Sequence, residues 1–570
     1  MKYKKYLPAV LLLLVGFIPL FDFFDRGLPI THDGQDHVAR VANFYQNLTD
    51  GNIIPRWAGN LNWGFGHPIL MFLYPLPSYL ASIFHFLSFS FVDSVKIVFG
   101  LSFITSGLAM YLWIQSFLGR NAGIVAGTLY MIAPYRFVDL YVRGAIGEHV
   151  AFIFPPLICY FIFKLSKKYS HLFVVGGAFS VAGLLLSHNA ISLMFLPLIF
   201  LYVIYLSFTS EESRSLPRHL RGGVAPQSNA AGTFDVPPAA HLGGVISMVL
   251  LGFGIAAFFW LPAFFEGKYT LRDIVTTGEY ASRFVRLEQF LYGPWSFGGT
   301  GQFSVQLGIV HWVIVAGSVV LLFLKKTAKE HKKLIGGLLI ITVIALFLMI
   351  PQSSNLWQNI SVLQKFQFPW RFMSVTVFST AVLGGLLVWI IPKRFKLPIV
   401  FCITVLVLFF NKDYWHTNGY LYKVDSFFSG IYNGTTDTGE SSPIWSVRFM
   451  EKRPKEHIEV VSGQATIKEL GRKSSVHVYE IDATEKSRML ENTLYFPGWD
   501  VLVDGRKVEI EFQDPRHRGL MTFFVDKGKH TVYIKFGETK LRGFSNTISI
   551  VSLLIVSFTT FIILWRKRLG

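Results

Sequence analysis

The chain has 570 residues, of which 52% are hydrophobic and 15% charged, and its net charge is +18. Soluble proteins carry about 25% charged residues, and many apolar stretches here reach the roughly 20 residues that span a bilayer. The composition therefore excludes an ordinary soluble protein and predicts a polytopic helical membrane protein. Lys and Arg stand in short clusters between apolar segments, as expected of cytoplasmic loops. Because this charge is scattered, no nucleic-acid partner is expected.

Apolar stretches that could cross a membrane follow one another along the chain. They lie at about 5–24, 68–90, 97–117, 121–134, 149–165, 170–187, 190–208, 242–263, 306–324, 334–351, 372–391, 397–411 and 545–565. Both ends of the chain are basic and should be cytoplasmic, which requires an even number of crossings. The stretch at 68–90 contains helix-breaking prolines, so we expect it to be partly re-entrant or to lie along the outer surface. We expect about twelve to fourteen crossings.

The chain divides into a membrane part and one β-rich part. The membrane domain is expected at 1–411, with a first outer loop at 25–67 and a flexible cytoplasmic loop, rich in Gly, Pro, Ser and Ala, at 209–241. Residues 412–544 alternate as strands do and contain hairpin-turn signals, which predicts an extracytoplasmic β-sandwich. A last helix and a basic tail follow at 545–570. The β-rich domain could hold an acceptor sugar or cover the membrane core.

The first outer loop has the densest cluster of ionisable, amide and aromatic side chains in the N-terminal half. Residues 35–49 have helical periodicity, and Asp36 and Arg40 have the spacing of a helix-surface pair. Asp33 stands just before this helix, where helix-end amides should keep its carboxylate ionised. An ionised carboxylate at the membrane mouth can accept a proton from a hydroxyl group. Asp36 is an alternative to Asp33 in this role.

Arginines of the same loop could hold a phosphate. Arg40 and Arg56 can each donate two parallel hydrogen bonds to phosphate oxygens. Alternatively, Arg56 contacts lipid headgroups, with Trp57 beside it at headgroup level.

A second polar cluster, YRFVDLYVRGAIGEH, occupies 135–149. Its Arg143, Glu148 and His149 precede an apolar helix. A charge at mid-membrane costs roughly 2.5–3.5 kcal/mol, so such residues usually face protein or water. Glu148 could assist catalysis or position a donor, or it could form a structural pair with Arg143.

Further polar residues stand at the predicted outer ends of apolar segments and could line one cavity. The candidate catalytic residues are Asp33, Asp36 and Glu148. The candidate substrate- or phosphate-binding residues are His37, Arg40, Arg56, Trp57, Arg143, His149, His188, Glu266 and Arg371. No metal ligands are assigned.

Several stretches resemble known membrane proteins. DGQDHVARVANFYQNLTDGNIIPRW, YPLPSYL, VRGAIGEHVAF and FQFPWRF resemble bacterial proteins described as 6-pyruvoyl-tetrahydropterin synthase-related. The tail, YFPGWDVLVDGRKVEI and GKHTVYIKF, is similar to the YfhO-type membrane proteins. Both groups look like distant relatives of the GT-C glycosyltransferases. Pterin-synthase chemistry itself is not expected, because that enzyme needs a zinc-binding histidine cluster and the histidines here are dispersed.

The GT-C resemblance implies a function on the outer face of the plasma membrane. It implies inverting transfer of a sugar from a polyprenyl-phosphate donor to a glycan or protein acceptor of the envelope. It also implies a catalytic acidic residue in the first outer loop, which matches Asp33, with Asp36 as the alternative. Many members have an adjacent acidic pair, whereas these two aspartates stand three positions apart, so the need for a divalent cation stays open. No other cofactor is expected.

Two other functions compete with this hypothesis. A flippase or transporter of a lipid-linked saccharide would place charges deep within helices, and transporters commonly contain internal repeats. Most charges here stand at segment ends and no repeat is apparent, which favours the enzyme. A non-catalytic scaffold that uses its β-rich domain would not need Asp33.

Overall fold

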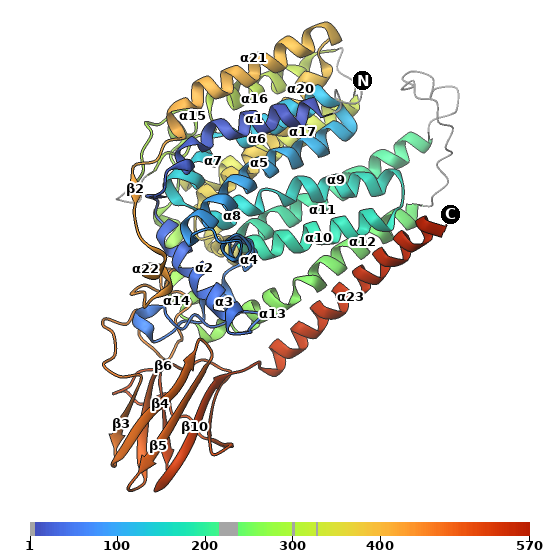
Figure 1. Cartoon of the computed structure of the whole chain (residues 1–570). Helices are drawn as coiled ribbons and strands as arrows, with labels where there is room; N and C mark the ends of the chain where they lie inside the picture. Colours follow the sequence, from blue (N-terminus) through green and yellow to red (C-terminus); the bar gives the residue numbers. More distant parts are fainter. Residues whose placement is uncertain (1–5, 216–237, 299–302, 326–328, 570) are drawn as a thin grey trace.

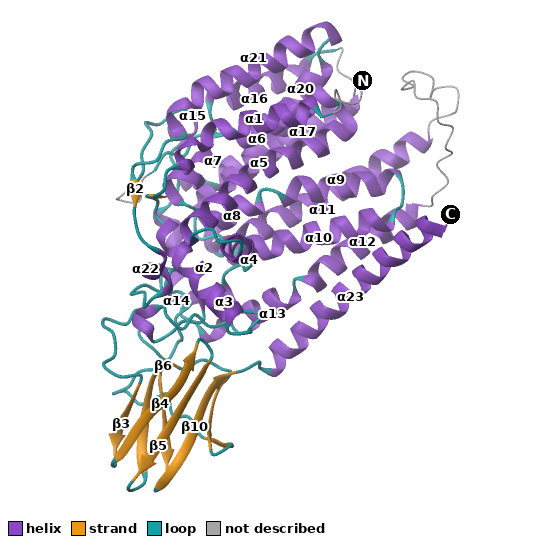
Figure 2. Ribbon diagram, in the orientation of Figure 1, coloured by secondary structure: helices purple, strands orange, loops and turns teal. Residues whose placement is uncertain are grey.

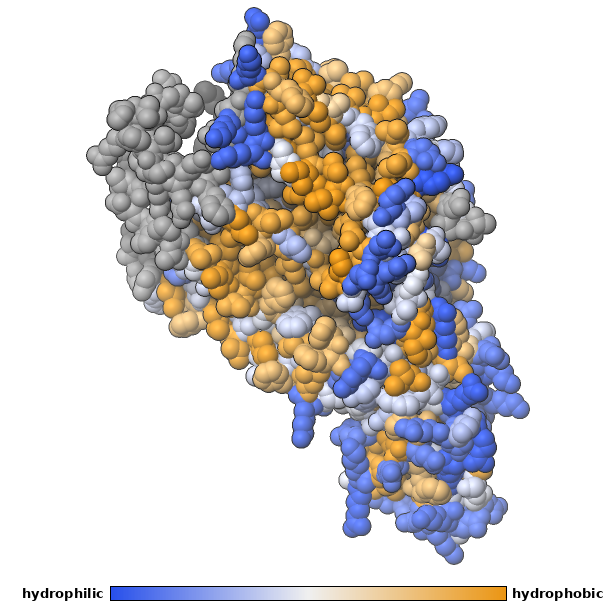
Figure 3. All heavy atoms as spheres, turned by 180° about the vertical axis from the view of Figure 1, so that it is seen from behind, coloured by the Kyte–Doolittle hydropathy of each residue, from blue (hydrophilic) through white to orange (hydrophobic). Residues whose placement is uncertain are grey.

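A computed structural model describes residues 6–215, 238–298, 303–325 and 329–569 of the chain. A body of helices carries a β domain at one end (Figures 1 and 2). Figure 3 shows that the visible face of the helical body is largely hydrophobic, whereas hydrophilic residues dominate the β domain. This contrast is the one expected when helices face lipid and strands face water.

The long helices account for most of the membrane part. They are α1 (Leu7–Phe17), α5 (Phe91–Leu118), α6 (Arg120–Met131), α9 (Phe154–Lys167), α10 (His171–Ser187), α11 (Asn189–Ser215), α12 (Pro238–Ile255), α13 (Ala257–Phe265), α16 (Ile309–Phe323), α17 (Lys329–Leu348), α20 (Met373–Ile390), α21 (Lys393–Asn411) and α23 (Lys540–Leu569). Among the described residues, eight helical segments are long and apolar enough to cross a membrane, or nine if α12 and α13, bent by 69°, form one span. The chain is therefore a polytopic helical membrane protein.

The number of such segments is smaller than the twelve to fourteen crossings expected from the sequence. The stretch at 68–90 forms two short helices, α3 (Ile69–Phe72) and α4 (Leu76–Phe86), because its prolines interrupt it. The stretch at 121–134 forms only α6, a 12-residue helix. Two further apolar helices, α10 and α16, are shorter than 18 residues. Of the predicted loop at 209–241, residues 216–237 lie outside the described ranges.

The predicted C-terminal β domain is confirmed. One antiparallel sheet has the order β4-β5-β10-β7-β8 and the other β3-β6-β9. The strands are β3 (Ile458–Ser462), β4 (Ala465–Lys473), β5 (Val476–Ala483), β6 (Ser487–Leu494), β7 (Trp499–Val503), β8 (Arg506–Val508), β9 (Leu520–Val525) and β10 (Gly528–Phe536). The two sheets share one hydrophobic core, to which Ile481, Met521 and Val532 contribute. Alternation along β5, where every second side chain is buried, contributes to this core, whereas β6 is buried along its whole length.

Residues 25–67, predicted as the first outer loop, lie between the helical body and the β domain (Figure 1). Helix α2 (Gly34–Thr49) of this segment packs against α4, α5 and α22 (Asp425–Ser429). Just before α2, β1 (Leu28–Pro29) pairs with β2 (Tyr420–Leu421), which belongs to the segment that leads into the β domain. These contacts hold the start of α2 at the end of the helical body that carries the β domain.

Candidate active site

The start of α2 is joined to the second polar segment through backbone hydrogen bonds. Asp33 N donates to the carbonyl of Arg143 at 2.9 Å. Gly144, whose φ is +71°, makes this approach feasible, because a Cβ there would lie 2.3 Å from Thr31 Oγ1. That hydroxyl accepts from Gly34 N at 3.0 Å and caps the helix. The two polar segments predicted from the sequence therefore meet in one site.

Asp33 occupies the cap position of α2 but does not cap it, because Thr31 takes that role. Among the described residues its carboxylate has neither a hydrogen-bond partner nor an ion pair, and its side chain is exposed to solvent. Protein nevertheless surrounds the group, and burial raises the pKa of the Asp33 carboxyl, while Arg143 and Arg40 oppose this rise. The expectation that helix-end amides control its ionisation is therefore replaced by a balance of burial against two arginines.

Asp36 is engaged, unlike Asp33. It accepts a hydrogen bond from Tyr432 Oη at 2.7 Å, and Tyr432 itself accepts from Gln35 Nε2 at 2.8 Å. The structure does not contain the expected Asp36–Arg40 pair within its described ranges. Arg40 instead contacts the carbonyl of Thr436, because the segment that follows α22 packs over this face of α2.

His37 stands one turn before Arg40 on the same helix face. Its Nδ1 lies 2.8 Å from Arg40 Nη1, while its Nε2 is buried and has no hydrogen-bond partner in the described part of the chain. Burial, together with the charge of Arg40, keeps the pKa of His37 well below its usual value. The imidazole is therefore neutral at physiological pH.

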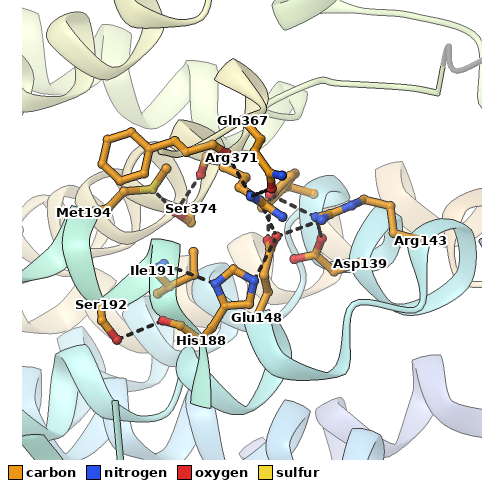
Figure 4. Close-up of polar contacts among 12 residues, drawn as sticks. Asp139, Arg143, Glu148, His188, Ile191, Ser192, Met194, Gln367, Arg371 and Ser374 are labelled. Atoms are coloured by element: carbon orange, nitrogen blue, oxygen red, sulfur yellow. Dashed lines mark hydrogen bonds and ion pairs between the residues drawn. The ribbon is translucent and has the colours of Figure 1, made fainter. Parts of the chain in front are cut away.

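Glu148 is the centre of a buried ionic cluster (Figure 4). It lies in α8 (Ile146–Ala151) and is fully buried. Its Oε1 is 2.8 Å from Arg143 Nη2 and 3.1 Å from Arg371 Nε, and its Oε2 accepts from Tyr135 Oη at 3.0 Å. His188 Nε2 lies 3.9 Å from the same carboxylate. These contacts occupy both oxygens, so Glu148 has the surroundings of a structural residue.

Asp139 completes this cluster and was not singled out in the sequence. Its Oδ1 accepts from Arg143 Nη1 at 2.7 Å, one turn earlier in the π-helical segment Val138–Arg143. The spacing of four residues from Arg143 is a signal that could have identified it. Asp139 and Glu148 thus balance Arg143 and Arg371, of which Arg371 stays slightly accessible at 11%.

Three predicted site residues lie instead where the first loop and α13 meet the β domain and α23. Arg56 Nε pairs with Glu538 at 2.8 Å, and Trp57 packs at 5.3 Å from Trp499. Glu266 pairs with Arg542 at 2.8 Å. Trp57 is only 1% exposed, so the expectation of a headgroup position for it is wrong, because the β domain covers it.

His149 is a predicted site residue whose ring lies among aromatic side chains. It is fully buried, stacks on Phe103 with ring centres 5.9 Å apart, and neither ring nitrogen has a hydrogen-bond partner among the described residues. The ring therefore makes no hydrogen bond to an acidic candidate in the described part of the chain.

A cavity of about 390 Å³ lies beside the site. Its lining includes Arg283, Arg286, Phe303 and Trp370. The ring of His32, next to Asp33 in the chain, lies 6.1 Å from that of Phe303. Arg283 Nε is buried without a hydrogen-bond partner in the described ranges. The sequence did not indicate Arg283, because it stands in a long connection without a clear pattern. The described residues contain no group of three or more His, Cys, Asp or Glu side chains placed to bind a metal ion.

Comparisons with known proteins give limited similarity. No family model matches the chain. An uncharacterized protein of Lactococcus lactis subsp. cremoris (strain MG1363) is 27% identical over 203 residues, which are 35% of this chain and 33% of that protein. The match therefore spans about a third of the length of that relative.

Among solved structures, the mycobacterial arabinofuranosyltransferase AftD aligns with a TM-score of 0.41 and 13% identity, over 73% of this chain and 27% of that one. ArnT from Cupriavidus metallidurans in the apo state aligns with a TM-score of 0.25 and 12% identity, over 68% of this chain and 78% of that one. Scores below 0.5 do not establish a common fold.

Proposed function

We propose that the chain is a GT-C-like glycosyltransferase of the plasma membrane that uses Asp33 as its general base. The observation that carries this proposal is the unpaired state of the Asp33 carboxylate. Of the three acidic candidates, Asp36 is bound by Tyr432 and Glu148 by two arginines, whereas Asp33 has no side-chain partner among the described residues. A free carboxylate with a raised pKa is suited to accept a proton.

The proposed reaction is the transfer of a sugar from a polyprenyl-phosphate donor, with inversion. Asp33 takes the proton of an acceptor hydroxyl, and the oxygen attacks the anomeric carbon. The bond from that carbon to the phosphate oxygen breaks, and the phosphate leaves with the electron pair. Because a phosphate leaves without protonation, one carboxylate is sufficient, in contrast to hydrolases that protonate the departing oxygen.

The cations of the adjoining cavity are suited to the departing phosphate. Arg283 and Arg286 line the adjoining cavity, and Arg371 follows Trp370 of the same lining. Positive groups fixed near developing negative charge stabilise a transition state of this kind. The aromatic side chains of the cavity, including Phe284 and Phe303, suit an isoprenoid chain. Arg143 is already neutralised by Asp139 and Glu148, whereas Arg286 and Arg371 each contact one carboxylate, of Glu288 and Glu148 respectively.

The proposed orientation places the first loop and the β domain outside the cytoplasm. In Figure 1, α1 begins and α23 ends at the end of the helical body away from the β domain. The basic residues at both chain ends favour a cytoplasmic position for that side. The acceptor would then be a glycan or protein of the envelope.

Mass spectrometry of envelope glycans and polyprenyl-linked sugars tests this function. It compares cells with the wild-type protein, cells that lack it, and cells with Asp33→Asn. The control is Asp482→Asn, which changes an exposed aspartate of β5. We expect the deletion and Asp33→Asn to lose the same glycan and to accumulate the same lipid-linked sugar. A glycan that is lost in the deletion but retained in Asp33→Asn would contradict the proposal and favour a flippase or a scaffold.

A further inference from the structure

A second cavity, of about 350 Å³, lies where the β domain meets the first outer loop. One wall comes from α2 and the chain after it and includes Gln46, Trp57 and Asn60. The other wall comes from the β domain and includes Arg472 and Lys473 of β4. Its volume falls within the roughly 300–1,000 Å³ typical of ligand pockets. It is separate from the cavity beside Asp33, since the two linings share no residue.

The deep side of this junction cavity is rigidly held. Glu491 is fully buried and lies 3.0 Å from Arg472 Nη1 and 2.8 Å from His477 Nδ1. Arg472 Nη1 also donates to Tyr479 Oη at 2.9 Å. Burial alone would raise the pKa of Glu491, but His477 and Arg472 outweigh it and hold the value at about 2. Arg472 is thus fixed in one orientation, and the shape of the cavity does not depend on a ligand.

The rim of the cavity has an excess of positive charge. Arg453 and Lys473 are both exposed, and neither has an acidic partner in the ranges that the structure describes. The carboxylate of Glu469 is already 2.8 Å from His457 Nδ1. Two cations that line one cavity can contact the same anionic group or two neighbouring ones. The cavity therefore favours a ligand with negative charges.

The remaining lining suits a sugar more than a simple ion. Side chains with amide and hydroxyl groups, Gln46, Asn60 and Ser474, stand beside the rings of Trp57 and Phe65. Amides and hydroxyls both donate and accept hydrogen bonds, as the hydroxyl groups of a saccharide require. A phosphate ion alone would leave most of these groups unused.

Helix α2 connects the junction cavity to the proposed base. Asp33 stands at its start and Gln46 in its last turn. At 1.5 Å per residue, the helix separates them by about 20 Å. A chain of several sugar rings can span such a distance, whereas a single monosaccharide cannot.

We propose that the junction cavity binds an acidic glycan, a saccharide that carries carboxylates or phosphates, and holds it as the acceptor while its terminal hydroxyl reaches Asp33. The role as acceptor rests on the proposed glycosyltransferase function, but the binding itself does not. Arg453 and Lys473 contact the negative groups, and the amides and hydroxyls contact the sugar rings.

Direct binding to the full chain in nanodiscs of neutral lipid tests this proposal. The probes are hexagalacturonate and an oligomer of glycerol phosphate, with maltohexaose as the neutral reference. The variant is Arg453→Gln with Lys473→Gln. The matched control is Lys452→Gln with Lys455→Gln, which removes two exposed positive charges of the same domain outside the cavity.

We expect at least one acidic probe to bind more tightly than maltohexaose. The cavity variant should weaken this binding by about tenfold or more, and the control variant by no more than about twofold. Equal weakening in both variants would overturn the proposal, because it would indicate a general attraction to positive charge. Equal binding of all three probes would overturn it as well. In a second set of nanodiscs that contain anionic lipid, loss of acidic-probe binding would show that a headgroup is the ligand, which also contradicts the proposal.

The same measurement with Asp33→Asn separates this proposal from the proposed function. Binding should be unchanged in that variant, because Asp33 is distant from the cavity. If wild-type cells and cells without the protein have identical glycans, the glycosyltransferase function fails while the binding result stands. If the cavity variant loses binding but cells that carry it make normal glycan, the acceptor role fails while the glycosyltransferase function stands.

Discussion

Two polar regions of the molecule, the start of α2 and the contact between α13 and α23, use the same residue types but pair their charges differently. At the second, Glu266 accepts from Arg542 Nε and from Thr539 Oγ1, both at 2.8 Å. At the first, the Asp33 carboxylate has no partner in the described part of the chain, although Arg143 and Arg40 are near enough to influence its pKa. A paired buried carboxylate holds elements together, whereas an unpaired one adds no stability and is available for proton transfer.

The largest expected effect on stability follows from Glu148→Ala. This change leaves Arg143 and Arg371 without their shared carboxylate in a buried place. Removing one partner of a buried ion pair costs about 3–5 kcal/mol. We expect the unfolding temperature of the protein in detergent, measured by fluorescence, to fall markedly. A temperature close to that of the wild type would show that the cluster does not support the fold.

Glu266→Ala should destabilise the protein without affecting the chemistry. Arg542, which is fully buried, would lose its carboxylate but keep the carbonyls of Pro497 and Gly537 as acceptors. We therefore expect the free energy of unfolding to fall by about 3 kcal/mol, near the lower end of the range for a broken buried ion pair. The transfer rate per folded molecule should equal that of the wild type. A slower transfer rate in the folded fraction would contradict the expectation that Glu266 contributes only to stability.

The pH dependence of transfer should report on Asp33. A general base acts only when deprotonated, so the rate should fall about tenfold per pH unit below its pKa. Because burial raises the pKa of Asp33, the fall should begin at a higher pH than for an ordinary aspartate. Arg40→Gln removes a positive neighbour that opposes this rise, so its acid limb should move to still higher pH. If the acid limb of Arg40→Gln stays at the wild-type pH, the measured ionisation is not that of Asp33.

The smallest expected effect is that of Tyr432→Phe. The change removes the hydrogen bond to Asp36, which is part-buried. Such a bond contributes about 0.5–1.5 kcal/mol. The unfolding temperature should fall slightly, and transfer should slow by less than about tenfold. A loss as large as that of an Asp33 variant would identify Asp36 as the acting carboxylate.

Local patterns in the sequence were enough to predict the membrane helices, the β domain and the helix that follows Asp33. Apolar runs and alternating strands depend on neighbouring residues, and so does the polar cluster at 135–149. The prolines that set 68–90 apart in the sequence divide it into α3 and α4, and several other expected crossings, such as α10 and α16, are shorter than 18 residues.

The partners of individual side chains could not be predicted in the same way. Arg371 reaches Glu148 from the short 3₁₀ helix Pro369–Phe372, just before α20, and Arg40 contacts Thr436, which lies in the segment before the β domain. Arg56 was predicted to hold a phosphate or to contact lipid headgroups, and Trp57 to lie at headgroup level, yet the β domain and α23 cover them. Contacts between residues hundreds of positions apart depend on the whole fold, and a single sequence contains no local signal for them.

The transfer rate of purified Asp33→Asn, relative to the wild type, tests the central claim most directly. The donor is the lipid-linked sugar that accumulates in cells without the protein, and the rates are compared at equal amounts of folded protein. Removing a general base should slow transfer by about 10²–10⁴-fold, with an unchanged unfolding temperature. A folded Asp33→Asn variant that transfers sugar at the wild-type rate would contradict the role of Asp33.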